Sequence, residues 1–174
     1  MLEAALMHGI RGEAASSFDQ VLRQREAQVL RTAFRILGNW ADAEDVAQEV
    51  FLRLHRRGLV FANDAAAGGW LYRVTVNLCL DRTRSRRPSQ ELPDVPSRER
   101  SAEAAVLMEE KKQRLMAALA TLPTKERAAV VLREIEGLST VEVAAALGSS
   151  EVTVRSQISK ALGRLRGILN RGDV

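Results

Sequence analysis

The 174-residue chain is predicted to be all-α, with two small helical domains joined by a flexible linker. Its composition favours helices over sheets, because 46% of the residues are hydrophobic but only 4% are aromatic, and Ala and Leu abound. Apolar residues recur at helical spacing in several successive segments. A proline-rich stretch then divides these segments into two blocks of similar size.

The first block, residues 18–87, contains three amphipathic segments with recognisable ends. We expect helices from Phe18 to a stop at Gly38, from about Ala41 to Arg57, and from about Gly69 to Ser85. A loop containing Phe61 and Asn63 is expected between the second and third helices. Residues 1–17 form an N-terminal extension for which the sequence predicts little.

The linker is predicted at residues 88–101, within the stretch Arg86 to Ser101, which holds three of the four prolines and almost no large apolar residue. The second block, residues 102–170, is expected to start with a helix from Ala102 to Leu122. Another helix, from Lys125 to Glu136, follows Pro123.

The end of the second block has the pattern of a helix-turn-helix. Ser139-x-x-Glu142 is a capping box that opens a short helix, and Gly148 can adopt the positive φ that closes it. Ser150 is the expected N-cap of a longer helix. In this motif the second helix can lie in the major groove of DNA.

The longer helix has one apolar and one polar face. The apolar side holds Val154, Ile158, Ala161 and Leu165; the groove-facing candidates are Thr153, Arg155, Ser156, Ser159 and Lys160. Arg164 and Arg166 are better placed for phosphates. An ordinary solvated basic helix is the alternative, but the turn chemistry and the small polar residues favour DNA contact.

The second predicted helix carries an acidic outward face. The candidates for contact with a basic protein surface are Asp42, Asp45, Gln48 and Glu49, with Glu44 beside them. Acidic residues in a first turn also complement the helix dipole, and an ordinary solvated face fits the pattern as well. Acid–base catalysis is poorly supported, because no catalytic set of residues accompanies the carboxylates.

The third predicted helix carries a stripe that could contact nucleic acid. Trp70, Arg73, Asn77, Asp81 and Arg84 follow one another at steps of three or four residues. Arg and Asn can bind phosphates and base edges, and Trp70 can stack on an unpaired base. Trp70 could equally belong to the core, which is the commoner place for a Trp at helical spacing.

The net charge, the single cysteine and the two histidines limit the class of protein. The net charge is +4, and the only cysteine, Cys79, excludes an internal disulfide and fits a reducing cytoplasm. His8 and His55 are isolated, so we expect no metal site, no cofactor and no catalytic residues. No signal peptide or apolar run of spanning length is present, so a soluble, cytoplasmic protein without membrane insertion is expected.

The order of three motifs resembles the extracytoplasmic-function group of bacterial sigma factors. These motifs are DAEDVAQEVFLRL from Asp42, WLYRVTVNLCLDRTRSRR from Trp70, and the run from ATLPTKERAAVVL through the helix-turn-helix. The similarity covers roughly Phe18 to Leu169. It implies a domain two in the first block, a domain four in the second, and a non-enzymatic role in transcription initiation.

The resemblance also implies partners and residue roles. Asp45, Gln48 and Glu49 match positions that dock on core RNA polymerase, and Asp42 is grouped with them. The positions that read the melted minus-ten strand of promoter DNA are matched by Phe61, Asn63, Asn77 and Asp81, with Trp70, Arg73 and Arg84 beside them. Arg155, Ser156, Ser159 and Lys160 match the readers of the minus-thirty-five element. Members of this family are usually held inactive by an anti-sigma factor, often membrane-anchored.

The chain departs from the sequence pattern of this family in two places, and two other functions are weighed against it. Gln157 and Leu162 stand where the family often has arginine, and Ala65 to Gly68 replace a region that often bears a phenylalanine. A stand-alone helix-turn-helix regulator would normally need a dimer interface, and the chain shows two dissimilar blocks and no heptad pattern. A helical enzyme or scaffold would not explain the order of the motifs.

Overall fold

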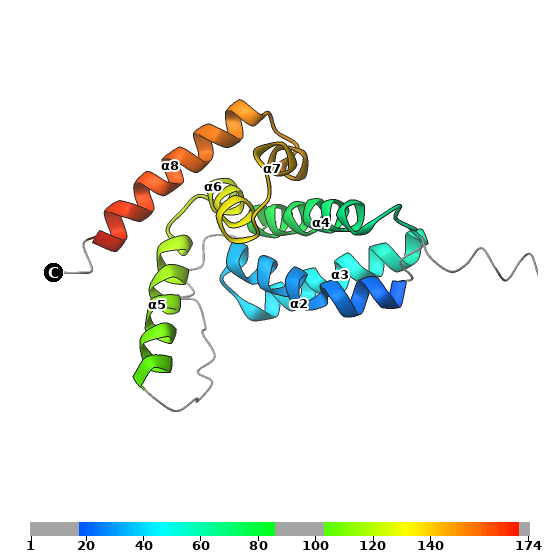
Figure 1. The fold of residues 1–174 in the computed structure, drawn as a ribbon, viewed down its shortest axis with the longest axis horizontal. Helices are drawn as coiled ribbons and strands as arrows, with labels where there is room; N and C mark the ends of the chain where they lie inside the picture. The colour runs from blue at the N-terminus through cyan, green and yellow to red at the C-terminus, as the bar shows by residue number, and fades with distance from the viewer. Residues whose placement is uncertain (1–17, 86–102, 171–174) are drawn as a thin grey trace, which may run out of the picture.

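The computed structural model describes residues 18–85 and 103–170, with the side chains of 103–107 excepted. The predicted N-terminal extension and linker lie outside the described residues. Every described element is a helix, as predicted, and Figure 1 shows two groups of helices side by side. We call α2 to α4 the N-terminal domain and α5 to α8 the C-terminal domain.

The N-terminal domain is built from three helices: α2 (Phe18–Leu37), α3 (Trp40–Arg57) and α4 (Asp64–Ser85). Asn39 caps α3 by accepting a hydrogen bond from the backbone N–H of Asp42, and Gly58 ends the helix at φ 55°. The core between the three helices includes Ala33, Val50 and Val76, all fully buried.

The start of α4 was predicted about five residues too late. The helix begins at Asp64 rather than at Gly69, because the Asn63 side chain accepts a hydrogen bond from the Ala66 N–H at 2.8 Å and caps it. The run Ala65 to Gly68 is therefore helical. The loop before α4 is short, and Phe61 in it is buried against Trp70, with ring centroids 6.0 Å apart.

The C-terminal domain contains α5 (Glu103–Ala120), α6 (Thr124–Val130), α7 (Thr140–Leu147) and α8 (Glu151–Leu169). One helix was predicted from Lys125 to Glu136; the structure shows α6 followed by a single π-helical turn, η1 (Val131–Ile135). A bond from the Glu136 N–H to the Val131 carbonyl, 3.0 Å, closes this turn.

The helix-turn-helix has the geometry that the sequence predicts. The Ser139 hydroxyl and the Glu142 carboxylate cap α7 reciprocally, and these bonds lower the pKa of Glu142. Gly148 lies at φ 58°, and Ser150 accepts from the Thr153 N–H at the start of α8. Val154, Ala161 and Leu165 are buried against the rest of the domain.

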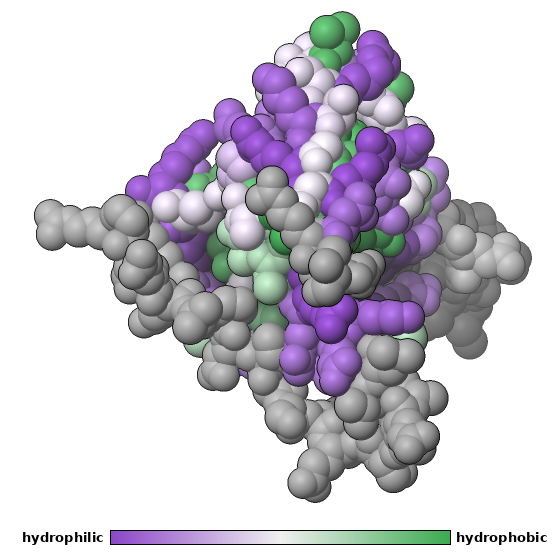
Figure 2. Space-filling model, turned by 90° about the vertical axis from the view of Figure 1, so that its left-hand side faces the viewer, coloured by the Kyte–Doolittle hydropathy of each residue, from purple (hydrophilic) through white to green (hydrophobic). Residues whose placement is uncertain are grey.

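The surface is mostly hydrophilic where α5 and α8 face outward. Figure 2 shows this side, with charged and polar side chains over most of the coloured surface and apolar side chains in scattered groups. Among the described helices, none is both long and apolar enough to cross a membrane.

Candidate functional site

The acidic face of α3 is smaller than the sequence predicts. Asp45 and Gln48 are exposed, and the Asp45 side chain is 57% accessible. Glu49 is half-buried and forms an ion pair with Arg53 one turn later, at 2.7 Å. These three residues remain on the outside of the domain.

Asp42 was wrongly placed on this outward face. It lies in the first turn of α3 and turns toward α4, where its side chain is 7% exposed and its Oδ1 accepts from Arg82 Nε at 2.7 Å. Arg82 also donates to Asp45 at 2.5 Å, so it bridges the buried and the exposed carboxylate. These carboxylates raise the pKa of Arg82, against the burial that lowers it. Asp42 therefore joins two helices and is not free to contact a partner.

An apolar hollow lies next to Gln48, between α2 and α3. It has a volume of about 250 Å³ and is lined by Leu22, Glu26, Leu30, Glu44, Ala47, Gln48 and Phe51. Acidic side chains at the rim of an apolar hollow suit a partner helix that carries both apolar and basic residues. The sequence pattern did not reveal this hollow, because it forms only when α2 and α3 pack.

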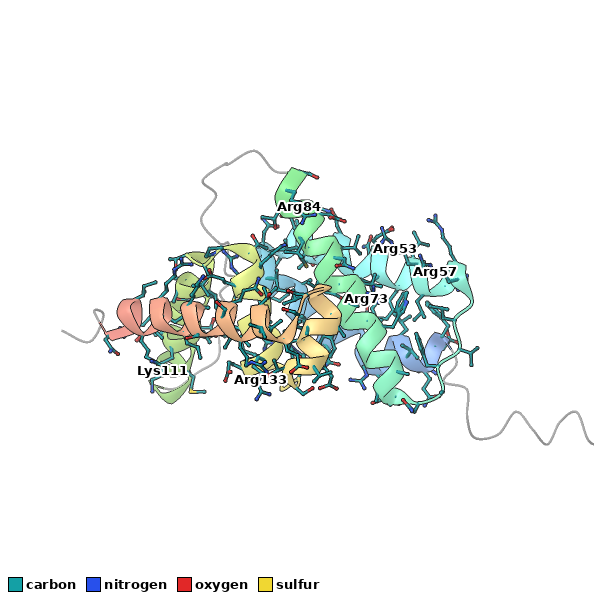
Figure 3. The ribbon with its side chains drawn as sticks, turned by 90° about the horizontal axis from the view of Figure 1, so that it is seen from above. Arg53, Arg57, Arg73, Arg84, Lys111 and Arg133 are labelled. Atoms are coloured by element: carbon teal, nitrogen blue, oxygen red, sulfur yellow. The ribbon has the colours of Figure 1, made fainter. Side chains whose placement is uncertain are left out.

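Most of the predicted stripe on α4 is exposed. Arg73, Asn77, Asp81 and Arg84 are exposed, while Trp70 is half-buried. Asp81 and Arg84 form an exposed ion pair at 3.5 Å. Figure 3 shows Arg73 beside α7 and Arg84 near the far end of α4.

Two predicted minus-ten residues are engaged within the protein. Phe61 is 8% exposed and packs on Trp70, so the expectation that it reaches a base is wrong in this conformation. Asn63 is exposed, but its Oδ1 is used to cap α4. The short loop explains both results, because it turns Phe61 into the domain and leaves Asn63 at the helix start.

The predicted groove-facing side of α8 is open. Thr153, Arg155, Ser156, Ser159 and Lys160 are all exposed on α8. Arg155 donates to Glu151 at 3.2 Å, an exposed pair in which both groups keep access to water. The Thr153 hydroxyl lies 2.8 Å from that of Ser150, at the N-terminus of the helix.

The arginines that are free to contact DNA phosphates differ from those that the sequence predicts. Arg164 was predicted to be suited to this role, but it forms an ion pair with the mostly buried Glu126 of α6 at 2.5 Å. Arg133, in the middle of η1, instead joins Arg155 and Arg166 around a hollow of about 320 Å³, which no acidic residue lines. Arg133 also donates to the Leu138 carbonyl at 2.8 Å, which holds it near α7 (Figure 3). No periodic signal in the sequence links Arg133 to α8.

Comparisons with known proteins agree with the two-domain arrangement. Residues 21–88 match the family description of sigma-70 region 2, and residues 112–165 match sigma-70 region 4. The chain is 41% identical over 162 residues to the ECF RNA polymerase sigma factor SigE of Mycolicibacterium smegmatis; the match covers 90% of this chain and 63% of that protein. It is 38% identical to SigM of Mycobacterium tuberculosis, covering 90% of this chain and 80% of SigM.

Solved structures show the same fold. The sigma factor RpoE of Bartonella quintana, solved with the anti-sigma factor NepR, matches with a TM-score of 0.69 at 21% identity, over 88% of this chain and 96% of RpoE. CnrH, solved with the cytosolic domain of CnrY, matches with a TM-score of 0.62 at 26% identity, over 88% of each chain. With region 2 and region 4 in this order and relatives near 40% identity, the chain belongs to the ECF family of RNA polymerase sigma factors.

Proposed function

We propose that this chain is an alternative sigma factor, which binds core RNA polymerase and directs it to specific promoters. It carries out no covalent chemistry itself. The observation that carries the proposal is the helix-turn-helix, whose caps, turn and exposed polar face all have the form that duplex recognition requires. Family membership and the second, dissimilar helical domain support it.

The polymerase surface is proposed on α3. Asp45, Gln48 and Glu49 lie on the outside of the N-terminal domain. Asp45 and Glu49 line a hollow between α3 and α4, whereas Gln48 lines the apolar hollow between α2 and α3. A partner helix with an apolar stripe and a basic edge would fill the hollow and pair with the acidic rim. Asp42 is excluded from this surface by its contact with Arg82.

The single-stranded minus-ten element is proposed to bind along α4. Arg73, Asn77, Asp81 and Arg84 supply exposed polar groups, and Trp70 offers part of its ring for stacking. Asn63 stands at the start of the same helix. Unstacking a base costs a few kcal/mol. Contacts of these residues with a base held out of the duplex would offset that cost.

The minus-thirty-five element is proposed to bind α8. Arg155 and Lys160 can donate to guanine edges, Ser156 and Ser159 can bond several bases, and the Thr153 methyl can contact thymine. Arg133 and Arg166 would hold the neighbouring phosphates.

The proposed setting is the cytoplasm, with an anti-sigma factor as regulator. One structure that shares the fold, RpoE, was solved with the anti-sigma factor NepR, which supports a regulator of this class. We propose no cofactor and no metal. Among the residues that the structure describes, no group of His, Cys, Asp and Glu is arranged to hold a metal ion.

Run-off transcription with core RNA polymerase tests this function. We expect promoter-dependent transcripts from some upstream regions of the chain's own genome, and Gln48→Arg should reduce both polymerase binding and transcript yield. Gln24→Arg is the control, because it adds the same charge at an exposed position of α2. Failure of every upstream region to give a transcript would reject the proposal.

DNA contact by Arg133 is tested by the salt dependence of binding to a labelled duplex of random sequence. Losing one phosphate contact lowers the slope of log affinity against log salt by about one unit. We expect this for Arg133→Gln and not for Lys111→Gln, which removes the same charge on α5. Equal slopes for the two variants would remove Arg133 from the DNA surface.

A further inference from the structure

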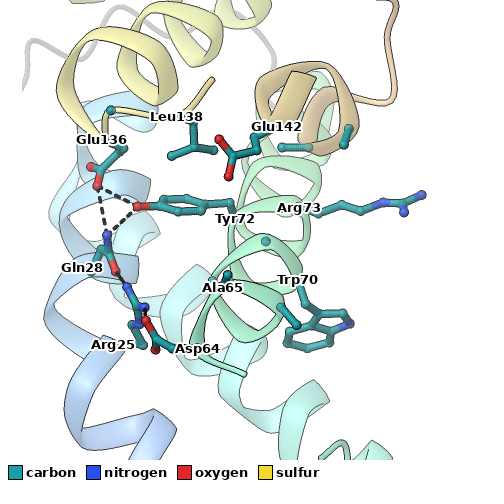
Figure 4. Close-up of a pocket in the computed structure, with 16 residues that line it drawn as sticks. Arg25, Gln28, Asp64, Ala65, Trp70, Tyr72, Arg73, Glu136, Leu138 and Glu142 are labelled. Carbon is teal, nitrogen blue, oxygen red and sulfur yellow. Dashed lines mark hydrogen bonds and ion pairs between the residues drawn. The ribbon is translucent and has the colours of Figure 1, made fainter. Parts of the chain in front are cut away.

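A carboxylate of the C-terminal domain is buried in the surface of the N-terminal domain. Glu136 follows η1, and its side chain is 7% exposed. Its acceptor oxygens receive hydrogen bonds from Thr32 at 2.9 Å, Arg35 at 2.7 Å, Tyr72 at 3.1 Å and Gln28 at 3.3 Å. Figure 4 shows Tyr72 and Gln28 converging on Glu136 across the boundary between the domains. Four donors on two helices therefore surround one carboxylate.

The donors to Glu136 also make contacts within the N-terminal domain. Thr32 is fully buried in α2, and Gln28 hydrogen-bonds the Tyr72 hydroxyl as well as Glu136. Arg25 pairs with Asp64 and with Gln28, which continues the network along α2 to the start of α4. Asp64 ends this network within the N-terminal domain, and Glu136 of the C-terminal domain is the acceptor on which the four direct donors converge.

Arg127 makes a second polar contact between the two domains. Arg127 of α6 donates to the Ile36 carbonyl at 2.8 Å, near the C-terminal end of α2 where the helix dipole favours a cation. Its other nitrogen donates to the carbonyls of Ala120 and Leu122, within its own domain. Burial lowers the pKa of Arg127. The side chain of Arg127 spans the boundary between the domains and is half-buried.

The contact places the two proposed DNA surfaces side by side. Tyr72 is next to Arg73 on α4, and α7 packs directly on α4 while α8 packs on α7. A hollow of about 560 Å³ between the domains is lined by Trp70 and Arg73 on one side and by Ala145 and Ala146 of α7 on the other. A single layer of helix, formed by α7 and α6 and roughly 10–12 Å across with its side chains, therefore separates α4 from α8.

Promoter DNA requires a different arrangement. The minus-ten and minus-thirty-five elements are named for positions about 25 base pairs apart, roughly 85 Å along a duplex at about 3.4 Å per base pair. Two surfaces separated by one layer of helix cannot reach both elements at once. The domains must therefore part before the chain holds both.

We infer that Glu136 is the latch of a closed state, in which the C-terminal domain packs on α4 and holds the proposed DNA surfaces of α4 and α8 too close together to reach both promoter elements. This inference rests on the proposed function for its biological meaning, but the closed state itself is a property of the chain alone. Closure lowers the apparent affinity for promoter DNA that carries both elements, because only the open fraction can hold both at once.

Energy transfer between two dyes on the full chain tests the closed state. Arg56→Cys on α3 and Gly163→Cys on α8 offer exposed attachment points, and a side chain at Gly163 would meet nothing within 4 Å. The native Cys79 should stay unlabelled, because it is fully buried and burial raises the pKa of its thiol to about 12. We expect one major population with high transfer.

Glu136→Gln keeps the shape of the side chain and removes its charge, and we expect it to move the major population to low transfer. Glu134→Gln, two residues earlier and exposed, removes the same charge and should leave transfer unchanged. Tyr72→Phe removes one donor and keeps the ring, so a smaller shift in the same direction is expected. Helical circular dichroism confirms that each variant is folded.

Low transfer in the unmodified pair, or equal transfer in Glu136→Gln and Glu134→Gln, would overturn the latch. If the latch holds, Glu136→Gln together with core polymerase should also bind promoter DNA that carries both elements several-fold more tightly than the parent chain does. A parent chain that is closed but never binds polymerase would reject the proposed function and leave the closed state standing. The two claims can therefore fail separately.

Discussion

Asp42 and Glu136 are buried to the same degree but stabilise different things. Each side chain is 7% exposed, and each accepts a hydrogen bond from an arginine at 2.7 Å. Asp42 receives its arginine from α4 of its own domain, whereas all the donors to Glu136 belong to the other domain. The same chemistry thus fixes a fold in one place and joins two bodies in the other. Removing either carboxylate should show this difference directly.

Asp42→Ala is expected to have the largest effect on stability. It removes the buried one of the two carboxylates that pair with Arg82 and leaves that arginine with the exposed Asp45 alone. Breaking a buried ion pair costs about 3–5 kcal/mol; we expect about 3 kcal/mol, because Arg82 is 37% exposed and can turn partly toward water. Urea unfolding followed by circular dichroism measures the loss.

Glu44→Ala is the control for this change, since Glu44 is exposed on the same helix. Similar losses for the two variants would mean that Asp42 is no more structural than a surface carboxylate. Polymerase binding by Asp42→Ala should fall only as far as its folded fraction falls, in contrast to Gln48→Arg, which should bind poorly while fully folded.

Thr32→Val tests the other side of the comparison and should weaken closure rather than the fold. The Thr32 hydroxyl donates to Glu136, and a hydrogen bond to a charged group contributes about 1.5–3 kcal/mol. Val has nearly the same shape, so the packing of α2 is kept. Dye-to-dye transfer in the Arg56→Cys, Gly163→Cys chain reports the shift toward the open state.

Thr75→Val is a matched control for Thr32→Val. Thr75 is also buried, but its hydroxyl donates to the Leu71 carbonyl one turn earlier in α4. Its loss should leave the balance between closed and open chains unchanged. Opening by Thr75→Val to the same extent as by Thr32→Val would show that any buried change on this face loosens the domains.

Sequence reasoning predicted the helices well where their signals are local. Ser139, Gly148 and Ser150 each set a helix end through their own neighbours, and all three act as expected. The start of α4 was missed because Asn63 caps a helix whose first turn, Ala65 to Gly68, lacks a distinctive apolar pattern. Local chemistry was decisive there as well, but the capping residue was assigned to a loop.

Side-chain roles were harder to predict than helices, because they depend on what another helix places opposite. Asp42 and Asp45 are alike in sequence context, and only the position of Arg82 on α4 separates the buried one from the exposed one. Arg164 was expected to contact phosphates but pairs with Glu126, whereas Arg133, for which the sequence predicted no role, lies beside Arg155 and Arg166. The donors around Glu136 lie more than sixty residues away in sequence, beyond any periodic signal.

The ionisation of Tyr72 is expected to have the smallest effect on closure at neutral pH, because the phenol loses its proton only in alkaline solution. Burial, and then the charge and hydrogen bond of Glu136, raise the pKa of Tyr72 well above its usual range, against a smaller opposing effect of Arg25 and Arg35. Because the pKa is higher in the closed chain, the contribution of Tyr72 to closure is complete below the ordinary phenol pKa of about 10 and is lost as the pH rises above it.

Tyr72 is the chain's only tyrosine, so tyrosinate absorbance in a pH titration reports this one residue. We expect the parent chain to ionise late and Glu136→Gln to ionise near the ordinary phenol pKa, because opening removes both the burial and the carboxylate. Glu134→Gln should titrate like the parent. Late ionisation that persists in Glu136→Gln would mean that Tyr72 is buried by its own domain, and the network would then stabilise that domain rather than hold the two domains together.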